Sequence, residues 1–329
     1  MRALITGGAG FIGYHLAKDL LDHHYEITLV DNFERGVKDS SLEELEKNDK
    51  VTLLSLDLQD SSSFEKIKGE YDYIYHLAAI IGVQNVLNKP DEVLRNNMLL
   101  LFNTIDFAKK QTQLKRFVFA STSEVYGGTL QYFHMEIPTP ESTPLTLTPL
   151  EHPRTSYMLS KIYGEAVMNQ SRLPFTIIRP HNFYGPRMGM SHVIPELLRK
   201  AWFDEGKGKL EVFSPTHKRT FCYISDAVEM IRMLAESSKS LGQAYNVGNQ
   251  EPEIAMGALA EIILKTVEKP YEVQNMENTS GSPERRCPNM EKTKECIGFT
   301  PKISLEEGVK KTFEWYKENI FSGVERGAK

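Results

Sequence analysis

Residues 1–13 read MRALITGGAGFIG, a short apolar run followed by a glycine-rich turn and then by a helical pattern. The glycines fit the spacing Gly8-x-Gly10-x-x-Gly13 and equally the spacing Gly7-x-x-Gly10-x-x-Gly13. Glycine lets the backbone turn sharply and approach a pyrophosphate, and the free N–H groups at a helix start attract its charge. The alternative is a tight turn without a ligand, which would require neither the strand before it nor the helix after it. Because both are present, we interpret the stretch as a dinucleotide-binding turn. The residues predicted to hold the cofactor there are Gly7, Gly10, Phe11, Ile12 and Gly13.

A second predicted strand, residues 26–30, leads into Asp31 and Asn32. A carboxylate at this place accepts hydrogen bonds from both hydroxyls of an adenosine ribose and would repel a 2′-phosphate. We therefore expect the cofactor to be NAD rather than NADP, with Asp31 and Asn32 at the ribose.

Composition narrows the range of partners. The 329 residues carry a formal net charge of −5, and their basic residues are not clustered, which argues against nucleic acid and against a membrane surface. No apolar run approaches the ~20 residues that cross a bilayer, and no targeting pattern precedes the first strand. We expect a cytoplasmic protein with a small ligand. Cys222, Cys287 and Cys296 show no CxxC spacing, so neither a disulfide framework nor a metal site is expected.

Short apolar runs alternate with helical patterns in the first part of the chain. The runs are residues 3–5, 27–30, 51–56, 73–76, 117–120 and 176–178. This alternation predicts an α/β fold, a Rossmann-type doubly wound parallel sheet. Longer polar loops follow, with helical stretches near residues 192–202, 226–237, 254–267 and 305–319, and they predict a smaller C-terminal lobe that binds the substrate. We place the NAD-binding domain at residues 1–180 with a later core strand at 244–247, assign residues 181–320 mainly to the lobe, and expect a flexible tail at 321–329.

Ligands of an open parallel sheet lie at the carboxyl ends of its strands. Asp57 and Leu58 follow the third strand and are expected to receive the adenine. Ala78 and Ala79 follow the fourth strand and either form a floor of small residues beneath the cofactor or simply pack. Residues 122–124, Thr-Ser-Glu, follow the fifth strand and face the reaction site.

Tyr157 and Lys161 lie four positions apart, on one face of a predicted helix. A nearby ammonium and a positive nicotinamide favour phenolate, which predicts a tyrosine pKa lowered from about 10 towards the operating range. A tyrosine so tuned is a general base for an alcohol, and Thr122 or Ser123 hydrogen-bonds the same substrate oxygen. The spacing alone is more typical of an exposed pair, but its place after a dinucleotide fold favours catalysis.

The chain contains the motifs TGGAGFIG, HLAA, STSEVYG, YMLSK, RPHNFYGPR, RTFCYISDAV and ERRCP, with Asp31 at its strand end. Together they resemble the NAD-dependent epimerase/dehydratase family, the extended short-chain dehydrogenases that act on nucleotide sugars. The roles this resemblance implies are Tyr157 as base, Lys161 as its pKa partner and ribose contact, Thr122 at the sugar O4, Asn182 and Arg219 at the nucleotide diphosphate, Arg286 at the diphosphate or the sugar, and Val193 at the base through its backbone.

Glu124 bears on the type of reaction. C4 epimerases of the family usually carry a small or neutral residue there, whereas Ser-Glu resembles the decarboxylases of UDP-glucuronate and the GDP-mannose 4,6-dehydratases. Oxidation at C4 makes the C5 proton acidic, and a carboxylate beside it could remove that proton or assist the loss of CO₂. The alternative is that Glu124 only caps the following turn or pairs with a neighbouring cation. The stretch AAIIGVQNV after the fourth strand departs from the decarboxylases and looks more like the epimerases.

We therefore expect an NAD-dependent enzyme that works through a 4-keto nucleotide sugar and is of the decarboxylase or dehydratase type, with a 4-epimerase as the alternative. An NAD-binding sensor or scaffold is a third hypothesis, against which the intact Thr122, Tyr157 and Lys161 argue. A UDP-sugar is favoured, and a GDP-sugar is the other candidate. The helices predicted at 93–109 and 157–171 are those on which relatives commonly pair, so a homodimer is expected.

Overall fold

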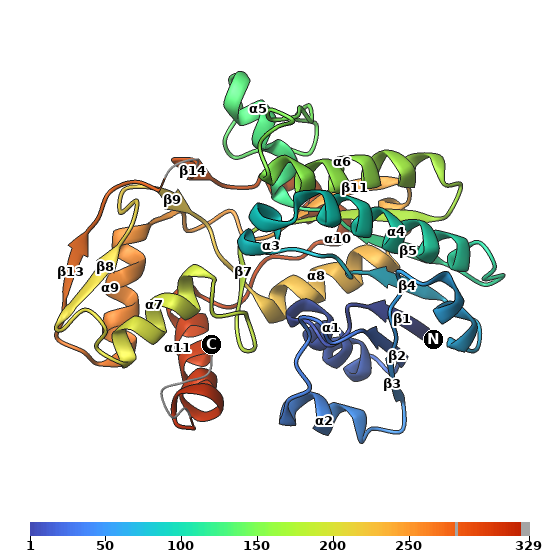
Figure 1. The fold of residues 1–329 in the computed structure, drawn as a ribbon, viewed down its shortest axis with the longest axis horizontal. Helices are drawn as coiled ribbons and strands as arrows, with labels where there is room; N and C mark the ends of the chain where they lie inside the picture. The colour runs from blue at the N-terminus through green and yellow to red at the C-terminus, as the bar shows by residue number, and fades with distance from the viewer. Residues whose placement is uncertain (280–281, 324–329) are drawn as a thin grey trace.

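The computed structural model describes residues 1–279 and 282–323. Seven strands form one sheet in the order β11-β6-β5-β4-β1-β2-β3 (Figure 1), and every neighbouring pair is parallel. The strands are β1 (Arg2–Thr6), β2 (Glu26–Asp31), β3 (Val51–Ser55), β4 (Tyr73–His76), β5 (Arg116–Ala120), β6 (Phe175–Pro180) and β11 (Gln243–Val247). The predicted Rossmann-type sheet is confirmed, and the predicted late core strand is β11.

Helices cover both faces of the sheet. On one face lie α1 (Phe11–Asp22) and α8 (Ile224–Glu236), and on the other α4 (Pro90–Ala108) and α6 (Arg154–Gln170). Successive strand residues point to opposite faces, so Leu4 joins the apolar core under α4 whereas Ile5 joins the core under α1. Burial on both faces is the reason these strands read as continuous apolar runs.

Shorter helices connect these elements. They are α2 (Ser40–Glu46), α3 (Val83–Asn88), α5 (Gly127–Tyr132), α10 (Glu291–Ile297) and the 3₁₀ turns η1 (Ser61–Lys66), η2 (Ser123–Tyr126) and η3 (Ser238–Ser240). The turn η2 starts directly after β5, so it places residues 122–124 at the carboxyl edge of the sheet.

The C-terminal lobe combines three helices with small sheets. Its helices are α7 (Val193–Trp202), α9 (Met256–Val267) and α11 (Leu305–Tyr316). Its paired strands are β7 (Phe183–Tyr184) with β10 (Cys222–Tyr223), β8 (Lys209–Val212) with β13 (Glu272–Asn275), and β9 (Lys218–Arg219) between β12 (Ile254–Ala255) and β14 (Arg285–Arg286).

Two expectations about the domains need correction. The helix predicted at 226–237 was assigned to the lobe, but it is α8 and packs on the sheet, because its apolar face, with Ile231 and Leu234, is fully buried there. The tail was predicted to start at residue 321, but Phe321 ends the π-helix η4 (Lys317–Phe321) and is buried against Trp202. The rest of that predicted tail, residues 324–329, lies outside the described residues.

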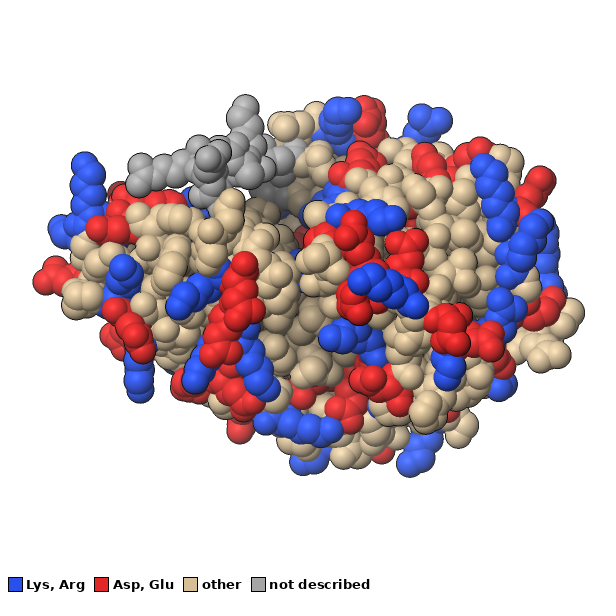
Figure 2. All heavy atoms as spheres, turned by 90° about the horizontal axis from the view of Figure 1, so that it is seen from below, with Lys and Arg blue, Asp and Glu red and all other residues tan. Residues whose placement is uncertain are grey.

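Acidic and basic side chains are intermixed on the face of the molecule shown in Figure 2, which agrees with the dispersed charge of the sequence. Within residues 1–279 and 282–323, none of the helices combines the length and apolar character needed to cross a bilayer.

Candidate active site

The glycine-rich turn joins β1 to α1. Gly7 has a φ of +73°, and a Cβ on it would lie 2.9 Å from the Ala78 nitrogen. A side chain on Gly13 would collide with the Gly7 carbonyl, so the turn requires glycine at both positions. The helix starts at Phe11 with no side-chain cap from Gly10, which leaves its first N–H groups free. This cradle fits the pyrophosphate of NAD.

Asp31 lies at the end of β2, beside the turn. Its carboxylate accepts hydrogen bonds from the Ala9 N–H at 3.0 Å and the Phe33 N–H at 2.9 Å. Burial raises the pKa of the Asp31 carboxyl, and the two N–H groups oppose that rise. Asn32 is exposed next to it, and its Oδ1 accepts from the Glu34 N–H at 3.1 Å. Each oxygen of Asp31 keeps a second lone pair, so its ribose contact stays a prediction.

The residues predicted near the adenine differ in how accessible their side chains are to a ligand. Asp57 is exposed, and its carboxylate accepts from the Gln59 N–H at 2.9 Å. The Leu58 side chain is only 3% exposed and packs in the core under α4, and its carbonyl accepts from Asn103 at 2.9 Å. An apolar residue after a strand is drawn into the core, so only the backbone of Leu58 stays a candidate for this contact. Among the other predicted cofactor residues, half-buried side chains belong to Ile12, Ala78 and Ala79.

Tyr157 and Lys161 lie on α6 beside the end of β5. Lys161 is 4% exposed, and its Nζ donates to the Ala120 carbonyl at 2.8 Å. The same nitrogen lies 5.8 Å from the centroid of the Tyr157 ring. The Thr122 hydroxyl lies close enough to the Tyr157 hydroxyl to lower its pKa. The structure therefore brings the three predicted catalytic groups together, with Ser123 buried behind them.

Without a cofactor the pKa of Tyr157 is raised, so the lowering predicted for the NAD-bound site stays a prediction. In the protein alone, burial raises the pKa of the phenol and the Glu124 carboxylate raises it further, whereas the Thr122 hydroxyl and the Arg35 guanidinium lower it. Desolvation of the phenolate outweighs the nearby cations, which the sequence pattern could not reveal. A positive nicotinamide beside the phenol would oppose this rise.

Lys161→Met is expected to stabilise the fold at neutral pH while abolishing turnover. Burial lowers the pKa of Lys161 from 10.5 to about 8. The folded chain then binds fewer protons than the unfolded chain between these values, so the burial penalty is complete below about pH 8 and is lost as pH rises through 10.5. The gain in the free energy of unfolding should be roughly 2 kcal/mol larger at pH 7 than at pH 10.

Urea unfolding of the parent protein and of the Lys161→Met variant at both pH values measures this difference. The exposed Lys109→Met variant is the control, for which no such pH dependence is expected. An equal effect of Lys161→Met at both pH values would contradict the burial penalty.

Asn97 on α4 is a site residue that the sequence analysis did not single out. It is buried, and its amide bonds both the N–H and the carbonyl of Ile80, at 2.7 and 3.1 Å. It also donates to the Ser160 hydroxyl at 3.2 Å, which donates in turn to the Tyr157 carbonyl at 2.7 Å. Asn97 thus ties the loop after β4 to the catalytic helix. A polar residue on the largely apolar face of the predicted helix 93–109 is the signal that could have found it.

Arg219 and Arg286 lie directly opposite each other, because β9 and β14 pair in parallel. Arg219 donates to the Ser282 hydroxyl at 2.9 Å and the Pro283 carbonyl at 2.6 Å, and burial together with Arg286 lowers its pKa to about 10. Burial also lowers the pKa of Arg286, and within the described part of the chain no hydrogen bond or ion pair engages its guanidinium. Two adjacent cations without a bound carboxylate favour a diphosphate ligand.

Glu124 is exposed at the start of η2, and its N–H is held by the Thr122 hydroxyl at 3.2 Å. Thr122 therefore caps this turn, not the Glu124 side chain. Among the described residues, no ion pair or hydrogen bond occupies the Glu124 carboxylate. It acts on two groups of the site through its charge, raising the pKa of both Arg286 and Tyr157. The arrangement leaves a free carboxylate close to the predicted base.

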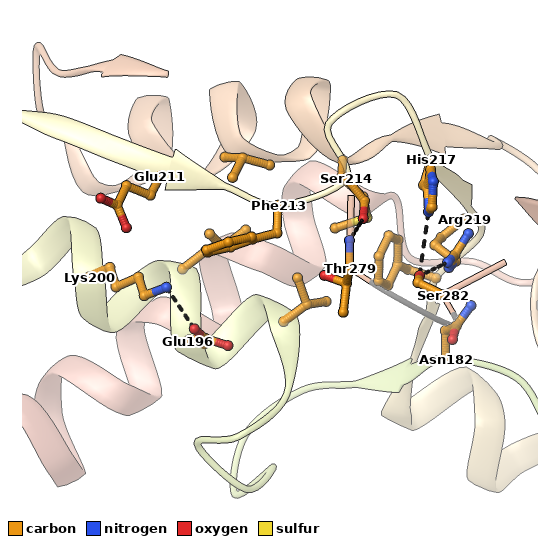
Figure 3. Close-up of a pocket in the computed structure, with 15 residues that line it drawn as sticks. Asn182, Glu196, Lys200, Glu211, Phe213, Ser214, His217, Arg219, Thr279 and Ser282 are labelled. Carbon is orange, nitrogen blue, oxygen red and sulfur yellow. Dashed lines mark hydrogen bonds and ion pairs between the residues drawn. The ribbon is translucent and has the colours of Figure 1, made fainter. Parts of the chain in front are cut away.

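A cavity of about 320 Å³ extends from Asn182 and Arg219 (Figure 3). Asn182 has a φ of +42° and donates to the Thr220 carbonyl at 2.9 Å. The Phe213 ring lies in the middle of the cavity, and residues of α7, including Val193, line another wall. An arginine end and an aromatic surface suit a diphosphate and a base, respectively.

A buried network holds the strand ends in place. Arg179 forms an ion pair with Glu165 at 2.7 Å, and Ser121, next to Thr122, donates to the same carboxylate at 2.5 Å. Since Glu165 lies one turn beyond Lys161, this network fixes the catalytic helix against the loop after β5.

The histidines at the strand ends have structural partners. His76 hydrogen-bonds the Thr6 hydroxyl at 3.2 Å, and His181 Nε2 hydrogen-bonds the Asn246 Oδ1 at 3.1 Å. Burial lowers the pKa of each to about 3, so both stay neutral.

The model of the NAD dependent epimerase/dehydratase family matches residues 3–248. The chain belongs to this family. It is 34% identical to the UDP-N-acetyl-alpha-D-glucosaminuronate decarboxylase of Bacillus cytotoxicus, over 96% of this chain and 98% of that protein. It is 33% identical to UDP-glucuronic acid decarboxylase 6 of Arabidopsis thaliana, over 94% of this chain and 87% of that protein.

A solved structure of the UDP-glucuronic acid 4-epimerase from Bacillus cereus, in complex with UDP-glucuronic acid and NAD, is similar with a TM-score of 0.81. The two sequences are 25% identical, and the match covers 97% of this chain and 99% of the other. The predicted family, fold and NAD dependence are confirmed, and the protein is an enzyme of this class. The roles of individual site residues stay predictions.

Proposed function

We propose that this protein decarboxylates a UDP-linked uronic acid through a 4-keto intermediate. The observation that carries the proposal is the free Glu124 carboxylate beside a catalytic Thr122, Tyr157 and Lys161, with Arg286 nearby. Relatives named as decarboxylases that match along most of their length support the same reaction.

Tyr157 takes the proton of the sugar O4 hydroxyl, and Thr122 hydrogen-bonds that oxygen. NAD, when bound, supplies the acceptor for the C4 hydride and returns it at the end of the cycle. Lys161 is held by the Ala120 carbonyl so that its charge favours the ionised phenol. The resulting C4 ketone makes the C6 carboxylate part of a β-keto acid.

Cleavage of the C5–C6 bond releases CO₂ and leaves the electron pair on the enolate of C5, C4 and O4. Tyr157, now protonated, donates to O4 and stabilises this charge. Glu124 transfers a proton from water to C5 of the enolate, which restores the C4 ketone. Reduction of that ketone at C4 gives a UDP-pentose from UDP-glucuronate.

UDP is the proposed nucleotide. The support is relatives whose names specify UDP-sugars, and the cavity of about 320 Å³ lined by Phe213 offers space for the nucleotide. In this assignment Arg219 and Asn182 hold the diphosphate, and the start of α7 near Val193 contacts the uracil.

Arg286→Met is expected to weaken ligand binding by at least ~10-fold, because it removes a charge-assisted contact from a desolvated site. Arg285→Met is the matched control, since its guanidinium pairs with Glu253 at 2.7 Å on the exposed side of the same strand. Calorimetry with UDP and with UDP-glucuronate distinguishes a contact between Arg286 and the diphosphate from a contact between Arg286 and the sugar. Loss for both ligands assigns Arg286 to the diphosphate, loss for UDP-glucuronate alone assigns it to the sugar, and loss for neither contradicts its role as a ligand contact.

The product assay tests the reaction itself. The purified protein with NAD is incubated with UDP-glucuronate and with UDP-N-acetylglucosaminuronate, and the products are analysed by mass spectrometry and NMR. The expected result is a nucleotide sugar that has lost CO₂. A product of unchanged mass with inverted C4 would replace the decarboxylase by the epimerase.

The 4-epimerase is the second candidate. It is favoured by the stretch AAIIGVQNV after β4, which resembles the epimerase branch, and by similarity to a 4-epimerase that binds UDP-glucuronic acid. In that reaction the ketone is reduced from its other face, and Glu124 has no role at C5.

A homodimer and a cytoplasmic location are also proposed. The helices α4 and α6 lie side by side, and Phe102 and Tyr163 on them are 40% and 46% exposed with ring centroids 6.3 Å apart. Such an apolar outer surface supports pairing of these helices with those of a second copy.

A further inference from the structure

The loop after β2, residues 32–39, lies against the glycine-rich turn and is called the strap here. Arg35 in the strap donates from Nη1 to the Ile81 carbonyl at 2.9 Å. Ile81 belongs to the loop after β4, and β1 lies between β2 and β4 in the sheet. The Arg35–Ile81 hydrogen bond therefore bridges two loops that flank the glycine-rich turn after β1.

The strap is fastened at two further points. Gly36 lies so close to the turn that a Cβ on it would come within 2.7 Å of the Ala9 Cβ and 2.8 Å of the Asp31 Oδ1. At its far end, Asp39 pairs with Arg187 of the loop after β7 at 2.7 Å, and that arginine lies 4.1 Å above the Tyr14 ring. These contacts hold the strap over the turn from both sides.

The bridge spans the expected path of a bound dinucleotide. The adenosine ribose is expected at Asp31, at the end of β2, and the nicotinamide near Tyr157, so the path between them runs past the glycine-rich turn in the same direction as the Arg35–Ile81 bridge. Arg35 is exposed, and no ion pair with a carboxylate is found for it among residues 1–279 and 282–323. An unpaired guanidinium above the path of two phosphates is attracted to them.

We propose that Arg35 closes the strap over bound NAD and contacts its pyrophosphate, so that the cofactor stays on the protein between turnovers. This role applies to any reaction in which NAD is reduced and reoxidised in place, so it does not depend on the decarboxylase assignment. Arg35 thus supplies a side-chain contact to the pyrophosphate from a different loop, in addition to the backbone of the glycine-rich turn.

The test measures the dissociation rate of NAD from the holoenzyme, by exchange of bound NAD for isotope-labelled NAD. Arg35→Met keeps the aliphatic stem and removes the charge, and the rate is expected to rise at least ~10-fold. Lys38→Met is the matched control on the same strap, because Lys38 pairs with the exposed side of α2, at Glu46, 3.2 Å away. Its rate should equal that of the parent.

An unchanged rate in Arg35→Met would overturn the proposal, as would an equal rise in both variants, which would indicate a general effect of charge on the strap. The affinity for UDP, measured on the same samples, should be unchanged in Arg35→Met. A parallel loss of UDP affinity would show that the site as a whole had loosened and would also overturn a specific contact with NAD.

Discussion

Tyr157→Phe is expected to lower turnover of the nucleotide sugar by ~10²–10⁴-fold while NAD stays bound. The substitution removes the hydroxyl that meets Thr122 and leaves the ring beside Lys161. Without that hydroxyl no group takes the O4 proton, so the C4 oxidation that precedes every proposed reaction fails. Turnover is measured by the product assay, and bound NAD is measured by absorbance after the cofactor is extracted.

Tyr163→Phe is the control for this variant, because Tyr163 lies on the same helix with an exposed side chain. It should retain the parent rate. Parent-like turnover of Tyr157→Phe itself would remove Tyr157 from the mechanism, and loss of NAD from the variant would mean that the tyrosine acts mainly on cofactor binding.

Glu124→Gln is expected to slow formation of the decarboxylated UDP-sugar by ~10²-fold or more, because C5 is no longer protonated efficiently, while C4 oxidation and loss of CO₂ continue. The amide has nearly the shape of the carboxylate but carries no proton between water and C5. Because the Glu124 side chain is exposed and unpaired among the described residues, the fold should be unaffected. Stopped-flow absorbance should show reduced cofactor accumulating in the variant, and mass spectrometry should show a 4-keto sugar.

The exposed Glu151→Gln is the control and should show neither species accumulating. Unimpaired formation of the decarboxylated product by Glu124→Gln would exclude Glu124 from the chemistry. A variant that still inverted C4 at the parent rate, with no CO₂ released by either protein, would favour the 4-epimerase.

Sequence patterns predicted the parts of the site that depend on neighbouring residues. The glycine spacing around Gly7 and Gly13 indicates a turn that side chains would block, and the structure shows that a Cβ on either residue would collide with neighbouring backbone. The spacing of Tyr157 and Lys161 reports one face of a helix, which α6 presents. The apolar runs report strands buried on both faces. Each of these is a property of local backbone geometry, which is why it can be read along the chain.

Tertiary structure alone decided how distant segments meet. Only the register of β9 with β14 sets Arg219 against Arg286, and only the sheet order places Arg35 and Ile81 on either side of the glycine-rich turn. The raised pKa of Tyr157 in the protein without cofactor has the same origin. Burial depends on which segments pack around the phenol, and desolvation of a charge grows with that packing, so the sequence spacing of Tyr157 and Lys161 could not determine the outcome.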